Sequence, residues 1–131
     1  MKDRKISPQQ LLSALWIFIL LNMLLRDMHQ FLNPTFMDQL MEQKVPEHLV
    51  LVFGIILEIP ILMVPLSLTL KNKLNKWANV FASCIALLGM VYSLTTADLD
   101  DFFFAIMEIG AVIIIIRTAF KLTASSVVAP K

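Results

Sequence analysis

The chain has a single cysteine, Cys84, which stands within an apolar stretch. One cysteine cannot form an intrachain disulfide or a CxxC redox pair, so the sequence argues against a thiol oxidoreductase. We interpret Cys84 as a small apolar packing residue.

The motifs that identify common enzyme classes are also missing. The sequence has no Gly-rich phosphate loop, no Ser/His/Asp arrangement, and no HxxxH, HExxH or ExxH spacing for a metal. No cofactor is therefore indicated by a specific motif, and the sequence leaves open whether the protein is an enzyme.

Apolar side chains are in excess, since 58% of the 131 residues are hydrophobic and the mean hydropathy is +0.77. A soluble domain of this size could not hide so many, so the surface is expected to face lipid. Four apolar runs are each close to the roughly 20 residues that cross a hydrocarbon core about 30 Å thick. The sequence predicts one all-α membrane domain over residues 1–131, a four-transmembrane-helix bundle with helices at about 11–32, 48–70, 77–94 and 100–120.

Basic and acidic residues are separated along the chain. The basic residues that precede the first helix, fill the link between the second and third, and follow the fourth are Lys2, Arg4, Lys5, Lys71, Lys73, Lys76, Arg117, Lys121 and Lys131. By the positive-inside rule, both termini are predicted to be cytoplasmic, in a multi-pass protein of the cell (inner) membrane. Because orientation explains the basic clusters, the net charge of +1 gives no reason to expect nucleic-acid binding.

Two local patterns lie within and before the second long helix. Between residues 33 and 48, apolar residues at helical spacing predict a short amphipathic helix on the outer surface. Within 48–70, Pro60 and Pro65 each free a backbone carbonyl about one turn earlier. We therefore expect the second long helix to be kinked and buried against its neighbours.

Two glutamates stand alone in apolar surroundings. Glu58 is the only ionisable residue in LVFGIILEIPILMVPLS (51–67), and Glu108 is the only one in FFAIMEIGA (103–111). When 53–59 is aligned with 103–109, Phe, Ile, Glu and Ile are identical. If this match is not chance between Ile-rich segments, it predicts two tandem helical hairpins related by a pseudo-twofold along the membrane normal. Both glutamates would then lie at matched depth near the midplane.

Other polar residues accompany these glutamates. Asn22, Arg26 and His29 fall at i, i+4 and i+7 on one face of the first helix, and Asp101 shares a face with Glu108. The candidate ligand-binding residues are Glu58, Glu108, Asp101, Asn22, Asn79 and Arg26.

Two carboxylates buried close together cannot both stay ionised cheaply, so at least one should hold a proton unless a cation lies between them. This permits proton exchange against a cationic substrate, ligation of a metal, or acid/base work on a lipophilic substrate. The metal alternative uses His29, Glu58, Asp101 and Glu108 as ligands. In a further alternative, the acids only hydrogen-bond to Asn22, Asn79 or Arg26 in a structural or accessory subunit.

Four segments carry a resemblance to a known family: LSALWIFILLNML (12–24), LEIPILM (57–63), NKWANV (75–80) and FFAIMEI (103–109). They resemble a family of small bacterial four-helix membrane proteins described only as a domain of unknown function. The resemblance covers nearly the whole chain. It implies the four-helix fold, places the family's acids on Glu58 and Glu108, and implies no activity.

The leading hypothesis is a module that binds or transports a proton, a cation or a small amphipathic molecule at the Glu58 and Glu108 pair. A membrane-embedded metalloprotein, or an enzyme acting on a lipophilic substrate, is the alternative. The expected partners are the lipid bilayer, a small-molecule or cation ligand, and a second copy of the chain in a homodimer.

Overall fold

The computed structural model describes residues 5–94 and 99–124, and the regular structure in these ranges is helical. The helices are α1 (Pro8–Phe31), α2 (Pro34–Glu42), α3 (Glu47–Thr69), α4 (Asn72–Ser93) and α5 (Leu99–Ala124). The all-α bundle is therefore confirmed, and α2 is the short helix expected before the second long one. The basic residues Lys2, Arg4 and Lys131 lie outside the described ranges.

Three of the helices are long and apolar enough to cross a membrane. They are α1, α3 and Asn72–Tyr92 of α4, with mean hydropathies of 1.7, 2.6 and 1.3 in their most apolar windows. The protein is therefore a multi-pass membrane protein, and its helices contact the lipid bilayer.

The apolar run alone predicts that the third long helix begins near residue 77. In the structure, α4 begins earlier, at Asn72. The added residues 72–76 include Lys73, which is exposed, and Lys76, whose Nζ lies 4.2 Å from the centroid of the Phe120 ring. Long lysine side chains of this kind can place their charge away from the hydrocarbon core while the backbone remains helical. A membrane helix can thus extend past the hydrocarbon core. In that region its residues are no longer apolar, so apolar composition does not indicate the residue at which the helix begins.

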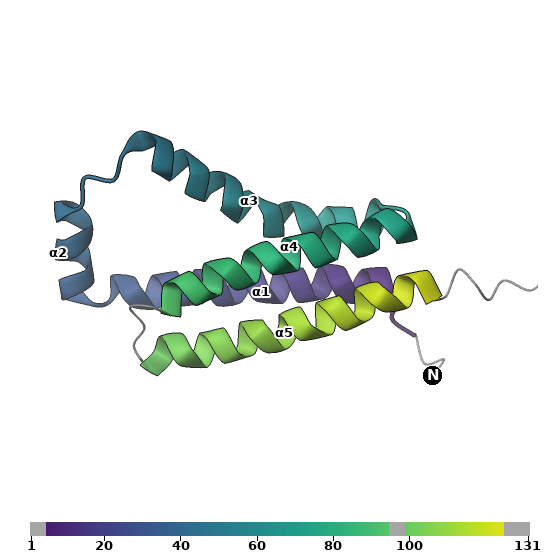
Figure 1. Cartoon of the computed structure of the whole chain (residues 1–131). Helices are drawn as coiled ribbons and strands as arrows, with labels where there is room; N and C mark the ends of the chain where they lie inside the picture. Colours follow the sequence, from purple (N-terminus) through teal and green to yellow (C-terminus); the bar gives the residue numbers. More distant parts are fainter. Residues whose placement is uncertain (1–4, 95–98, 125–131) are drawn as a thin grey trace, which may run out of the picture.

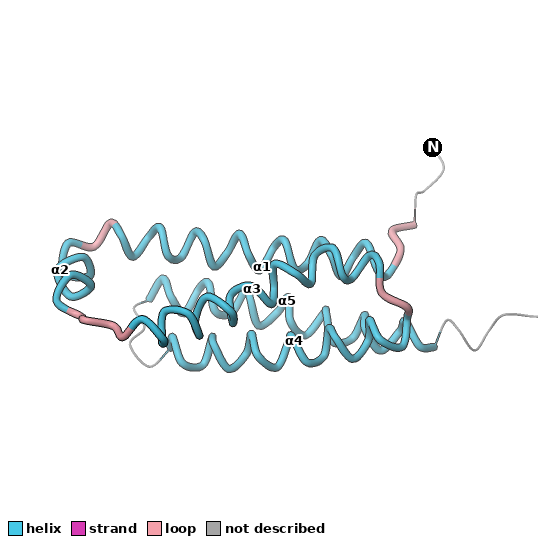
Figure 2. Tube along the Cα trace, turned by 90° about the horizontal axis from the view of Figure 1, so that it is seen from above, coloured by secondary structure: helices cyan, strands magenta, loops and turns pink. Residues whose placement is uncertain are grey.

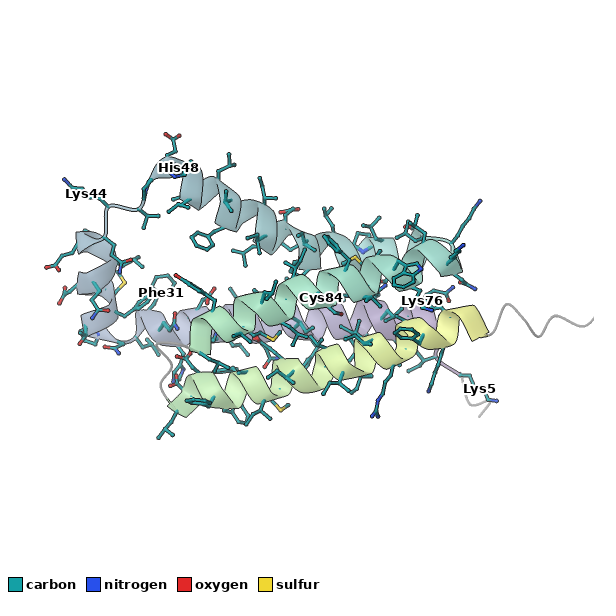
Figure 3. All side chains as sticks on the ribbon, viewed as in Figure 1. Lys5, Phe31, Lys44, His48, Lys76 and Cys84 are labelled. Carbon is teal, nitrogen blue, oxygen red and sulfur yellow. The ribbon has the colours of Figure 1, made fainter. Side chains whose placement is uncertain are left out.

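The long helices lie side by side, with α2 joining α1 to α3 at one end (Figure 1). The closest packing is between α1 and α3, α4 and α5, and α1 and α5, while α3 and α4 touch less. Because each long helix reverses direction, the start of α1, the α3–α4 link and the end of α5 share one end (Figure 2). Lys5 and Lys76 lie at this end, and Lys44 and His48 lie at the other (Figure 3).

The first half of α3 stands apart from the bundle. Residues 47–58 are all exposed, whereas Pro60, Met63 and Ser67 are buried. The expectation that this whole helix is buried is therefore wrong for its first half. The reason is that α3 diverges from α1 and α4 as it approaches α2 (Figure 1).

Most of the core residues come from α1 and α5, and α3 and α4 also contribute to it. In α5 one set of buried residues is spaced three or four positions apart, as expected for one helix face: Asp101, Ala105, Glu108, Val112, Ile115, Ala119 and Leu122. Ala111 and Thr118, which border this face, are buried as well. Val112 and Ile115 belong to the same apolar cluster as Trp16 and Ile19 of α1. Glu108 therefore enters the interior on the face of α5 that forms the core.

Cys84 is exposed, so its prediction as a packing residue is wrong. Its neighbours Ala82 and Ser83 are the buried residues of that turn of α4.

Candidate functional site

Glu108 lies in the interior and faces the guanidinium group of Arg26. Its side chain is fully buried, and Arg26 Nη1 of α1 lies 3.5 Å from its Oε2 atom. This distance is longer than the roughly 2.7–2.9 Å of a strong charge-assisted hydrogen bond. The other carboxylate oxygen, Oε1, is buried and has no hydrogen-bond partner among the described residues. The ion pair thus leaves half of the carboxylate unsatisfied.

Arg26 reaches this position because α1 turns a continuous face inward. Leu12, Trp16, Ile19 and Asn22 precede it at helical spacing, and all are buried. Arg26 itself is 9% exposed. Asn22 and Arg26 are thus buried in the bundle, whereas His29, the third polar residue on this face of α1, is exposed.

A cavity of about 310 Å³ opens beside this ion pair, and we call it the Glu108 cavity. Its residues come from four helices: Met23, Arg26, Asp27, Phe53, Ile56, Leu57, Pro60, Ile85, Ala86, Gly89, Met90, Tyr92 and Glu108. Most of the wall is apolar and is contributed by α3 and α4. The charged groups in the lining are Arg26, Asp27 and Glu108, that is, two carboxylates and one guanidinium.

Small residues of α4 keep this space open. Ala86 and Gly89 line the cavity, and nothing lies within 4 Å of the position that a Cβ atom on Gly89 would occupy. The sequence indicates Ala82, Ala86 and Gly89 as a small-residue face for close helix packing. Ala82 is packed in this way, but the wall at Gly89 faces empty space.

Glu58 does not share this site. Its side chain is exposed, and it is not among the residues that line the cavity. Each helical residue is rotated by about 100° from the last, so Glu58 lies roughly opposite to Ile56 and Pro60, which do line it. The structure therefore does not bring Glu58 to Glu108, although the two occupy equivalent places in the aligned segments.

Asp101 and His29 lie near the end of the bundle that carries α2. The Nε2 atom of Gln30 donates to Asp101 Oδ1 at 3.5 Å, and His29 Nε2 lies 3.8 Å from Asp100 Oδ2. These residues line a separate, open hollow of about 830 Å³ between α1, α2 and α5.

The four proposed metal ligands are not gathered. Within residues 5–94 and 99–124, no group of three or more His, Cys, Asp or Glu side chains is placed to hold a metal ion. His29 and Asp101 lie at the hollow, Glu108 lies at the cavity, and Glu58 is exposed.

Asn79 belongs to a buried network that joins three helices. Its Oδ1 accepts from Trp16 Nε1 at 2.7 Å and from Ser67 Oγ at 3.4 Å. Its Nδ2 donates to Asn75 Oδ1 at 2.7 Å, and Asn75 Nδ2 donates to the Ser67 carbonyl at 2.7 Å. Because these bonds occupy its amide, Asn79 ties α4 to α1 and α3 and does not line the cavity.

Asn22 is also satisfied within the protein. Its Nδ2 donates to the carbonyl of Phe18, one turn earlier in α1, at 2.9 Å. It is buried but does not line the Glu108 cavity. Of the six predicted ligand-binding residues, the structure brings together only Arg26 and Glu108.

Sequence reasoning missed several residues of the cavity. Asp27 lies about 100° around α1 from Arg26, so the sequence allows it to reach either the membrane interface or a neighbouring helix and does not place it at a site. No local pattern identified Phe53, Met90 or Tyr92. These residues meet only because α3 and α4 approach Glu108 from different sides.

Comparison with known proteins gives one match. No curated protein and no solved structure matches the chain. A family model covers residues 2–128, which is nearly the whole chain, and its description is a family of unknown function. The protein therefore belongs to this family, DUF6326, as its four-segment resemblance to a family of unknown function implies.

Proposed function

We propose that this protein binds, and through binding transports, a small amphipathic molecule in the Glu108 cavity. The carboxylate of Glu108 is the polar anchor, and the apolar walls from α3 and α4 receive the body of the ligand. Unlike the expected pair of glutamates, this site uses one glutamate together with Arg26 and Asp27.

One observation carries the proposal, namely a fully buried carboxylate oxygen that has no hydrogen-bond partner within the described part of the chain and lies beside a cavity with apolar walls. A buried polar atom left unpaired is costly, and it gains a hydrogen bond when a ligand supplies a donor. The volume of about 310 Å³ is at the lower end of the roughly 300–1,000 Å³ range of small-molecule sites.

The proposal includes α5 as a fourth membrane span, with both termini in the cytoplasm. At 1.5 Å per residue its 26 residues extend about 39 Å, enough to cross a hydrocarbon core of about 30 Å. It packs along α1 and α4, and its Ile113 and Ile114 are half exposed, as lipid-facing residues would be. Four spans return the chain to the side on which it begins, where most of the described lysines gather.

A cavity-filling variant tests the binding site. Three probes with one apolar body and different head groups are phenylbutanol, phenylbutylamine and phenylbutyrate. Thermal unfolding of the purified protein in detergent, followed by far-UV circular dichroism, should show a higher Tm with at least one probe. Gly89→Leu should abolish this rise, because its side chain enters the cavity.

Gly54→Leu is the matched control. Gly54 also has open space around a Cβ position but does not line the cavity, so this variant should keep the response. If no probe raises the Tm of the wild type, or if Gly89→Leu responds as the wild type does, the proposal is wrong.

A further inference from the structure

We propose that the ligand of the Glu108 cavity is a lipophilic cation, namely an amine that is dissolved in the bilayer and carries its charge to Glu108. This inference rests on the binding function proposed above and specifies the chemical class of the ligand.

The charges that line the cavity favour a positive head group. Asp27 and Glu108 contribute two carboxylates, and Arg26 is the single basic side chain among the lining residues. Arg26 contacts Glu108 through Oε2, so the unpartnered Oε1 atom remains for a second donor. An ammonium group supplies both the N–H donor and the charge that offsets the second carboxylate.

The same groups discriminate against other head groups. A carboxylate would meet two like charges and bring no donor, so its entry is opposed. A hydroxyl can donate a hydrogen bond to Glu108, but it leaves the excess negative charge of the lining uncompensated. The charge of the ligand, and not only its shape, should therefore decide binding.

The walls show how such a molecule can arrive. Phe53, Ile56 and Leu57 line the cavity and belong to the half of α3 whose residues 47–58 are all exposed. This half borders lipid, and α3 packs less closely on α4 than the other neighbouring long helices pack on one another. An amphiphile in the bilayer can thus pass between α3 and α4, with its apolar body in contact with apolar side chains throughout.

The test compares head groups and glutamates in one experiment. Binding of phenylbutylamine, phenylbutanol and phenylbutyrate is measured by calorimetry on wild-type protein, Glu108→Gln and Glu58→Gln in lipid nanodiscs. The amine should bind the wild type about tenfold more tightly than the alcohol, the advantage expected of one charge-assisted hydrogen bond. Phenylbutyrate should bind most weakly.

The two glutamine variants should behave differently. Glu108→Gln should remove the advantage of the amine over the alcohol, whereas Glu58→Gln should retain it, because Glu58 is exposed outside the cavity. If Glu108→Gln does not fold, Asp27→Asn replaces it, since removing this second carboxylate should also reduce the advantage. An advantage that persists unchanged in the variant that folds overturns the inference.

The outcomes separate this inference from the proposed function. If the alcohol binds the wild type as tightly as the amine and Gly89→Leu blocks both, the ligand is amphipathic but need not be cationic. In that case the inference fails and the binding function remains. If Gly89→Leu binds every probe as the wild type does, or if no probe binds the wild type, both fail.

Discussion

Glu108 and Arg26 are opposite charges whose burial is tolerated only because they face each other across the interior of the bundle. Taking either charge out of water costs several kcal/mol, and attraction offsets this cost only when the geometry is good. The 3.5 Å separation and the unpartnered Oε1 atom indicate that the geometry is not optimal. An ion pair of this kind stabilises the fold less than an apolar pair could, which fits a role in binding.

Removing one member of the pair should destabilise the protein. In Glu108→Gln, the buried Arg26 loses its ion pair with Glu108, so the free energy of unfolding should fall by about 3 kcal/mol. Denaturant unfolding in detergent, followed by far-UV circular dichroism, measures this change. The double variant Arg26→Met/Glu108→Leu should recover most of the loss, and a double variant less stable than Glu108→Gln would contradict this view of the pair.

The buried amide network should contribute to stability without affecting ligand binding. In Asn79→Ala, Trp16 Nε1 loses its acceptor and Asn75 Oδ1 loses a donor, so the loss should be roughly 3 kcal/mol. Asn22→Ala is the control, because it removes only a bond to its own helix and should cost about 1 kcal/mol or less. Equal losses in the two variants, measured by the same unfolding assay, would show that the network does not stabilise the bundle.

Of the two glutamates, the burial of one could be predicted from local spacing. Asp101, Ala105, Glu108 and Val112 fall at intervals of three and four, so Glu108 shares the core face of α5. No such pattern fixes the environment of Glu58, because most residues around it in α3 are equally apolar. Its burial depends on which face the neighbouring helices cover, which one sequence does not specify.

The helix α3 has two parts with different surroundings, and they meet near Pro60. A proline inside a helix removes one backbone hydrogen bond, and the residues before it can therefore change direction. The part that follows, with Met63 and Ser67, is held by the bundle, and Asn75 also bonds to the Ser67 carbonyl. The first part also supplies Phe53, Ile56 and Leu57 to the wall of the Glu108 cavity, so a change in its direction would alter the width of the cavity.

The different surroundings of the two parts of α3 should appear in the rates of amide hydrogen exchange. The amides of residues 47–58 should exchange faster than those of 61–69 in detergent, because the first part has few buried contacts to oppose local opening. Exchange followed by mass spectrometry of peptic fragments measures both parts in one sample. Equal protection of the two parts would contradict the view that the first part of α3 is loosely held.

The apolar pattern of the sequence predicts the helices better than it predicts where they begin and which side faces the core. The long helices and the short α2 were all predicted, because runs of about 20 apolar residues and a Pro-bounded amphipathic segment are strong signals. The start of α4 was missed, because its first turn is basic and lies outside the apolar run. The lipid-facing or core-facing side of each helix was harder to predict, since residues on both sides are apolar.

For the whole molecule, the separation of charge predicts orientation. The end that holds Lys5 and Lys76 should face the cytoplasm, and the end that holds Lys44 should face outward. The orientation and the homodimer remain predictions, whereas the helical, multi-pass architecture follows from length and hydropathy.

Cysteine labelling of intact cells tests the orientation. In a Cys84→Ala background, a membrane-impermeant maleimide should label Lys44→Cys directly and should label Lys73→Cys only after the membrane is permeabilised. Both positions are exposed, so access from one side of the membrane is the only intended difference between them. The reverse pattern would mean that the orientation is inverted and that the termini face outward.

The central claim is that Glu108, and not Glu58, receives the polar group of a ligand. Carbon NMR of protein labelled at the glutamate side-chain carboxyl, with signals assigned by Glu108→Gln and Glu58→Gln, tests it directly in nanodiscs. On addition of phenylbutylamine, the Glu108 signal should shift in a saturable manner and the Glu58 signal should not. A saturable shift of Glu58 alone, or an unchanged Glu108 signal when the amine is bound, would contradict the account.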